Sequence, residues 1–271
     1  MKRFARMFAP FLAALVALGV FGGSAMAATP APGYEQFAGC PSPAEDPAVT
    51  ACLRSTISGG HFQMGSKDVP ITNPITLSGG LDPNTEIVSA NAKGGLTPVK
   101  QPVPGGIIGL TGLDWLVNFL NIEQLKLYAV TELAGAPKSS IQSFTLPIKV
   151  HLINPVLGNN CYVGSTANPI ALDLTTGTTD PPAPNEPITG VAPEFNFDEA
   201  TEILTFKDGT FVDNSFSAPG ASGCTLTLLG IIPFSLNSLV NSQSGLPSAA
   251  GKNETTQDFD LELAPSELAY P

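Results

Sequence analysis

Proline and glycine interrupt this chain so often that long helices are excluded. The 271 residues include 26 prolines and 27 glycines. Proline lacks the backbone N–H that a helix interior needs, and glycine weakens helices and strands alike. Short stretches of alternating apolar residues lie between these interruptions, which is typical of strands joined by turns. The sequence therefore predicts an all-β fold, a disulfide-stapled sandwich of about ten strands with one or two short helices.

The clearest predicted strand runs from Phe144 to Ile153, where apolar and polar side chains alternate. A second alternating set runs from Leu125 to Leu133. The runs 203–206 and 210–212 flank Asp208-Gly209, which predicts a hairpin turn because glycine accepts positive φ. We expect further strands at 62–64, 71–77, 86–89, 170–174, 224–229 and 257–263.

Two segments have the apolar spacing of a helix face. Residues 113–120, which include Trp115, place four apolar side chains at that spacing, and residues 236–240 repeat the pattern more weakly. By contrast, Asp180 to Pro187 contains four prolines and predicts an extended loop. This loop either divides the domain or crosses between two sheets.

Residues 1–27 have the features of a secretory signal peptide. Lys2, Arg3 and Arg6 precede an apolar run from Phe8 to Phe21, and Ala25-Met26-Ala27 forms a small-residue cleavage site. The apolar run is shorter than the roughly 20 residues of a spanning helix. We therefore expect cleavage before Ala28, and a single secreted β-rich domain over 28–271 without a transmembrane anchor. The product is either released or retained non-covalently at the cell envelope.

The chain is acidic, with a formal net charge of −11 that becomes more negative when the basic leader is removed. Binding to nucleic acid needs clustered Lys or Arg to neutralise phosphates, and this sequence has no basic stripe. Nucleic acid is thereby excluded as a partner. The charge suits solubility outside the cell, where the partner is an unknown envelope or extracellular component.

All four cysteines follow the predicted leader, so they enter a compartment that permits disulfides. Four cysteines allow three pairings. We favour Cys40 with Cys52, which bracket a short proline-rich segment, and Cys161 with Cys224, which lie beside predicted strands. A zinc site is the competing interpretation, but the sequence has no C-x-x-C and neither of its two histidines lies near a cysteine. We expect no metal and no other cofactor.

No catalytic constellation stands out. The G-x-S-x-G pattern of serine hydrolases is missing, and Gly220-Ala221-Ser222-Gly223 is the nearest string. His61 is expected at the start of a strand, and His151 on the polar face of the strand at 144–153. We therefore assign no catalytic residue, and a secreted hydrolase stays an alternative.

Three acids, Asp258, Asp260 and Glu262, alternate with apolar residues and so share one strand face. Such a row is a weak candidate for a Ca²⁺ site, since carboxylates are calcium ligands. The same pattern is typical of an ordinary solvated strand face that discourages edge-to-edge pairing.

The apolar stretch 104–121 is a candidate contact surface. If exposed, it would form a lipid-contact or partner-binding patch, and if buried it would belong to the core. Binding to liposomes distinguishes these interpretations. The residues of this patch are Ile107, Ile108, Leu110, Trp115 and Leu116.

Several strings between residues 105 and 255 are distinctive. They include Leu157-Gly158-Asn159-Asn160-Cys161-Tyr162-Val163-Gly164-Ser165 and Gly245-Leu246-Pro247-Ser248-Ala249-Ala250-Gly251-Lys252-Asn253. On these strings the chain resembles a group of small secreted β-rich proteins from high-GC Gram-positive bacteria. The resemblance implies a bacterial source, supports pairing of Cys161 with Cys224, and implies no activity. We interpret Gly158 to Cys161 as a tight, disulfide-held junction in which Gly158 and Asn159 adopt unusual backbone conformations.

The sequence thus favours a secreted, non-enzymatic protein that acts at the cell surface or outside the cell through binding. A secreted hydrolase is one alternative. A protein that binds lipid or another hydrophobic ligand is the other.

Overall fold

The computed structural model describes residues 28–106, 126–140, 143–228 and 232–271. The chain is 47% strand and 7% helix, and its four cysteines form two disulfides, which confirms the predicted class. The predicted leader, the helix at 113–120 and the apolar patch at 107–116 lie outside the described residues. The elements in chain order are η1 (Glu35–Phe37), β1 (Ala51–Met64), β2 (Lys67–Pro70), β3 (Ile75–Leu81), β4 (Val88–Ser89), β5 (Gly95–Leu96), β6 (Lys100–Pro102), β7 (Tyr128–Leu133), β8 (Lys138–Ser139), β9 (Ser143–Ile153), β10 (Tyr162–Val163), β11 (Ile170–Thr175), β12 (Glu194–Asp198), β13 (Ile203–Asp213), β14 (Ala221–Ser222), β15 (Thr225–Leu228), β16 (Ile232–Ser235), α2 (Asn237–Ser244), β17 (Glu254–Pro265) and α3 (Ser266–Ala269).

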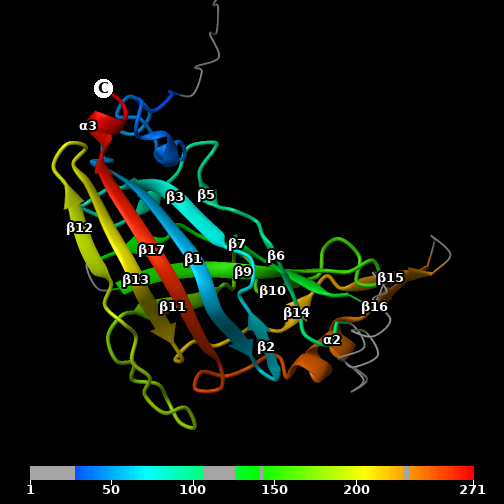
Figure 1. The fold of residues 1–271 in the computed structure, drawn as a ribbon. Coiled ribbons are helices and arrows are strands. Elements are labelled where there is room, and N and C mark those ends of the chain that lie inside the picture. The colour runs from blue at the N-terminus through cyan, green and yellow to red at the C-terminus, as the bar shows by residue number, and fades with distance from the viewer. Residues whose placement is uncertain (1–27, 107–125, 141–142, 229–231) are drawn as a thin grey trace, which may run out of the picture.

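Nearly all the strands belong to one antiparallel sheet of 15 strands, and β15 and β16 form a separate hairpin. The main path runs β14-β10-β9-β11-β13-β17-β1-β3-β4, while β6 joins through β7 to β9. In Figure 1, β13, β17 and β1 form the near layer, and β9 and β7 cross behind them. The two halves of one curled sheet therefore face each other.

Backbone hydrogen bonds join β4, at one end of this path, to the segment around β8, which pairs with β9. The N–H of Val88 donates to the carbonyl of Pro137 at 2.9 Å, and the N–H of Ser139 donates to that of Glu86 at 2.8 Å. A bridge between Ile87 and Lys138 lies between these bonds. The strand at one end of the path is therefore also bonded to the opposite half of the sheet, which keeps unpaired sheet edges few.

Strict alternation builds the core from the strand predicted most clearly. Along β9, the side chains of Phe144, Leu146, Ile148, Val150 and Leu152 are buried, and the residues between them are not. The same alternation in β11 buries Ile170, Leu172 and Leu174. Because successive strand side chains point to opposite faces, this pattern alone orients both strands toward the interior.

The Asp208-Gly209 hairpin prediction is wrong. Residues Ile203 to Asp213 form the single strand β13, and its register against β17 shifts between Phe206 and Gly209. The positive φ belongs to Asp208, at +56°, and not to Gly209, on which the prediction rested, and it lies within a bulge. A bulge and a two-residue turn use the same residue types, and only the partner strand distinguishes them.

The agreement between prediction and structure varies among the other elements. Strands occur at 128–133, 170–175, 225–228 and 254–265, and α2 lies where the weaker helical pattern predicted a helix. Residues 62–64 belong to the much longer β1, whose first part the sequence pattern does not reveal. Gly158 adopts a φ of +71°, as predicted, whereas Asn159 is not among the positive-φ residues.

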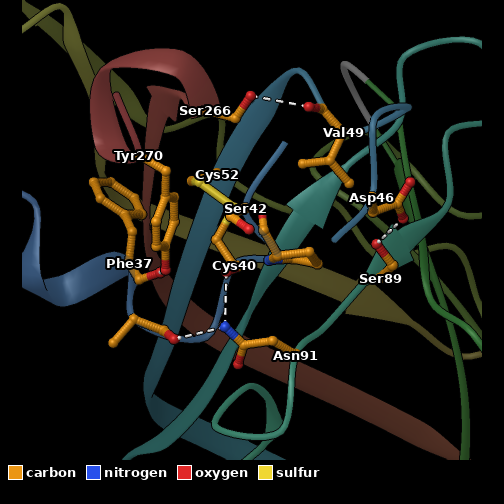
Figure 2. Close-up of a disulfide and its surroundings, with 12 residues drawn as sticks. Phe37, Cys40, Ser42, Asp46, Val49, Cys52, Ser89, Asn91, Ser266 and Tyr270 are labelled. Carbon is orange, nitrogen blue, oxygen red and sulfur yellow. Dashed lines mark hydrogen bonds between the residues drawn. A yellow bond between two sulfur atoms is a disulfide. The ribbon is translucent and has the colours of Figure 1, made fainter. Parts of the chain in front are cut away.

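The segment around Phe37 packs against the last residues of the chain around Tyr270, as Figure 2 shows. The hydroxyl of Tyr270 donates to the carbonyl of Phe37 at 3.1 Å, and that of Ser266 donates to the carbonyl of Val49 at 2.9 Å. The side-chain amide of Asn91 donates to the carbonyls of Ala38 and Cys40. We call this the terminal cluster, and its buried residues are Phe37, Cys40, Val49, Cys52, Ala264, Ala269 and Tyr270.

Both favoured disulfides are present. Cys40 pairs with Cys52 inside the terminal cluster, and Cys161 pairs with Cys224 beside β10 and β14. The sequence separations are 12 and 63 residues, for which the chain-entropy model gives about 3 and about 4 kcal/mol of stabilisation. The disulfides thus act at two separate places, the terminal cluster and the edge at β10 and β14, in a sheet whose strands come from distant parts of the chain.

Buried asparagines hold the proline-rich segment against the sheet. The side-chain amide of Asn185 donates to the carbonyls of Asn214 and Asn253, and that of Asn214 donates to the carbonyl of Glu186. Asn214 and Asn253 are completely buried. Residues on both sides of this segment contribute to one apolar core.

We expect Tyr270→Phe to lower the free energy of unfolding by about 1 to 2 kcal/mol, because the buried Phe37 carbonyl loses its donor. Urea unfolding of the oxidised protein measures the change. Tyr162→Phe is the control, since its hydroxyl lies 3.4 Å from Glu132 Oε1 in a half-buried contact and should contribute less. Equal losses in the two variants would contradict a special role for the terminal cluster.

Candidate functional site

Two apolar cavities lie inside the curled sheet, one of about 60 Å³ and one of about 50 Å³. The first lies between β1, β3 and β17 on one side and β7, β9 and β11 on the other. The second continues from it toward α2, where Val240 and Leu246 line it. Each has room for several water molecules, and each is much smaller than the roughly 150 Å³ cavity that admits benzene.

The two cavities share a wall. Phe62 and Met64 come from β1, Val69 from β2, Ala129 from β7 and Val150 from β9. Val150 is buried, whereas the other four are only partly buried and pack against the core. Partly exposed apolar side chains on an inward face leave apolar area in contact with water, which costs roughly 25 cal/mol of free energy for each Å². An apolar molecule that covered this wall would remove that cost.

A bulge in β1 places two of these side chains inside. Ile57 pairs with Phe259 and Gly59 with Asp258, so Ser58 is an extra residue without a partner. Before the bulge, the odd-numbered Ile57 faces inward. After it, the even-numbered Phe62 and Met64 face inward. Without the extra residue the period of two would turn Phe62 and Met64 outward.

The glycines Gly59 and Gly60 follow directly after this bulge. Gly60 has a φ of +99°, and a Cβ there would lie 2.1 Å from the carbonyl oxygen of Thr256. A side chain at this position is therefore excluded by both conformation and space. The sequence shows the glycines, but nothing in it indicates that they carry a bulge and not a turn.

Two glutamines line the first cavity among mostly apolar neighbours. Gln101 is fully engaged: its Oε1 accepts from the N–H groups of Thr72 and Asn73 at 3.0 Å, and its Nε2 donates to the Asn73 carbonyl at 2.6 Å. It thereby fastens β6 to the segment after β2. Gln257, on the inward face of β17, is 4% exposed and its Oε1 has no hydrogen-bond partner among the described residues.

His61 lies on the outer face of the sheet, within β1 and not at its start as predicted. Its Nδ1 is 2.9 Å from Asp68 Oδ1, and its Nε2 is 3.6 Å from Glu254 Oε1. In the described part of the chain, no hydroxyl or thiol is hydrogen-bonded to this ring. The arrangement is an ion-pairing site between carboxylates and lacks the nucleophile that a hydrolase needs.

His151 is on the outer face of β9, as predicted, but is largely covered. Its ring stacks on that of Tyr162 with centroids 4.3 Å apart, and its Nε2 lies 3.1 Å from the carbonyl oxygen of Asn159. Its Nδ1 is 3.5 Å from Glu132 Oε1. The contacts fasten β10 to β9 and do not involve either cavity.

The three acids of the weak calcium candidate share the outer face of β17, and each has its own partner. Asp258 Oδ1 accepts from the hydroxyl of Thr210, Asp260 Oδ1 from the N–H of Asp208, and Glu262 pairs with Arg54 at 3.2 Å. The described ranges contain no group of three or more His, Cys, Asp or Glu side chains that could hold a metal ion.

Asp213, at the end of β13, is a buried acid that the sequence did not single out. It is 2% exposed, and its two oxygens accept from the backbone N–H groups of Asp173 and Ser215, each at 2.8 Å. Burial raises the pKa of this carboxyl above its ordinary value of 3.8, and the two hydrogen bonds only partly oppose the shift.

No family model, curated protein or solved structure matches this chain. In the part of the chain that the structure describes, none of the helices combines the length and apolar character needed to cross a membrane.

Asp213 should make stability depend on pH. Because its pKa is higher in the folded state, the native protein binds this proton more tightly, and stability falls as pH rises from 3.8 toward the raised value. We expect the free energy of unfolding of the wild type, measured relative to Asp213→Asn, to decrease over this window. The exposed Asp180→Asn serves as control and should give no such trend. A difference that stays constant with pH would contradict the assignment.

Proposed function

We propose that this protein is a secreted, non-enzymatic binding protein that holds a slender apolar ligand between the two halves of its sheet. The observation that carries the proposal is the pair of adjoining apolar cavities with a shared, partly exposed wall. This interior site differs from the apolar patch at 107–116, which lies outside the described residues.

The size of the cavities indicates the class of ligand. Pockets for drug-sized molecules measure about 300 to 1,000 Å³, far more than the volumes found here. A ring system would therefore displace strands that are locked by their neighbours. An unbranched alkyl chain is narrower than a ring, and Met64 and Phe62, which line both cavities, lie where it would pass from one to the other. Methionine is well suited to such a position because its side chain is unbranched and flexible.

Two disulfides support the assignment of the protein to the outside of the cell. Such bonds form and persist in oxidising compartments and are rare in the cytosol. An apolar ligand carried outside the cell would come from, or be delivered to, the cell envelope. Retention of the protein at the envelope would follow from that exchange and needs no anchor of its own.

The hydrolase alternative has no comparable support. Among the described residues, neither histidine ring is hydrogen-bonded to a hydroxyl or thiol side chain, and both rings face the outer side of the sheet. The cavities are lined mainly by aliphatic and aromatic side chains, and Lys67 is the charged residue at the second one. We therefore propose ligand binding over catalysis.

Titration of the oxidised protein with 1-decanol, monitored by calorimetry, tests the proposal. We expect saturable binding to one site in the wild type. Ala129→Leu should weaken it by roughly tenfold or more, since the added carbons fill the shared wall and overpacking costs about 1 to 3 kcal/mol.

Ala171→Leu is the matched control, because Ala171 is exposed on the outer face of β11. It should bind 1-decanol as the wild type does. If 1-decanol does not bind, or if both variants bind it as tightly as the wild type, the cavities are not the site.

A further inference from the structure

Gln257 has an unpaired hydrogen-bond acceptor inside an otherwise apolar cavity. Its side chain lines the first cavity and its Oε1 has no partner among the described residues. Buried polar atoms are nearly always hydrogen-bonded, and each exception calls for an explanation. Gln101, in the same cavity, shows the usual arrangement, with both ends of its amide engaged. The difference between the two residues points to a partner for Gln257 that comes from outside the chain.

The neighbouring hydroxyl fixes which end of the Gln257 amide is left without a partner. Thr255 Oγ1 lies 2.8 Å from the carbonyl oxygen of His61, which can only accept, so the single hydroxyl proton is used there. Thr255 Oγ1 can then offer only its lone pairs to Gln257, at 3.4 Å. The group beside it must therefore be the NH₂ of Gln257. The carbonyl oxygen Oε1 is the end that remains for a ligand.

No side chain stands directly opposite Gln257 on β1. Gly60 is the residue directly opposite Gln257 in the β1–β17 pairing, and it has no side chain. A Cβ at Gly60 would collide with the Thr256 carbonyl, so no residue larger than glycine fits opposite Gln257. Ile57, Ile75 and Leu172 line the same cavity and have no side-chain donor.

We infer that the ligand is an aliphatic alcohol, whose hydroxyl donates to Gln257 Oε1 while its alkyl chain lies along the shared wall of the two cavities. This inference rests on the proposed function and names the ligand's polar group. A carboxylate has no proton to donate and would place its charge against the Gln257 carbonyl oxygen in an uncharged lining. An alkane or an ether leaves that oxygen unpaired. The hydroxyl of an unbranched alcohol meets both requirements.

The test compares 1-decanol with its methyl ether, 1-methoxydecane, which has the same chain but no hydroxyl proton. We expect the wild type to bind the alcohol about tenfold more tightly than the ether, which is the ratio that one hydrogen bond to a buried acceptor supports. Gln257→Leu should bind the two probes equally, because neither finds an acceptor there. Its melting temperature without ligand should not fall, since the substitution removes an unpaired polar atom.

Thr131→Val is the matched control, because Thr131 lines the same cavity from β7 and valine keeps its shape. The preference for the alcohol should persist in this variant. If the wild type binds the two probes equally, the inference is overturned and the proposed function stands. The same holds if the preference for the alcohol is lost in Thr131→Val but kept in Gln257→Leu. Failure of both probes to bind would overturn the proposed function itself. The wild-type comparison decides the question even if Gln257→Leu does not fold.

Discussion

The antiparallel pairing of β1 with β17 is the interaction on which the rest of the structure depends. It joins residues 51–64 to residues 254–265, and each strand has a second partner on its other side. At one end it carries the terminal cluster with its disulfide, and at the other it places Phe62 and Gln257 in the lining of the first cavity. Contacts so distant in sequence are costly in chain entropy, although that cost grows slowly with loop length. The Cys40–Cys52 bond and the buried Tyr270 offset part of it where the pairing begins.

The interior of the protein combines tight packing with one poorly filled region. Around β9 and β11, aliphatic side chains are almost completely buried, as expected of an interior packed to crystal-like density. Around the shared wall, Phe62, Met64 and Ala129 remain partly exposed, and Gln257 lacks a partner. A region that is both incompletely packed and incompletely hydrogen-bonded is less stable than its surroundings. Such regions are expected where a protein must open for a ligand.

Much of the fold could be predicted because alternation in a strand is a local property. The pattern at Phe144 to Ile153 gave β9 and its buried face directly, and the acidic row at 258–262 lies on the outer face of β17 as its alternation indicates. The misassigned hairpin at Asp208-Gly209 shows the limit of that reasoning. The positive φ of Asp208 is compatible with a turn or a bulge, and the choice depends on β17, which lies about fifty residues further along the chain.

The sequence by itself determined the strand-rich class, the inward faces of β9 and β11, and the absence of a recognisable hydrolase motif, because proline, glycine and period-two alternation act through the local backbone. Tertiary structure alone decided the candidate site. The bulge at Ser58 reverses which side chains of β1 face inward, and the bond from Thr255 to His61 leaves Gln257 Oε1 as the unpaired end of its amide. Both effects arise between strands nearly two hundred residues apart, so no window of the sequence contains them.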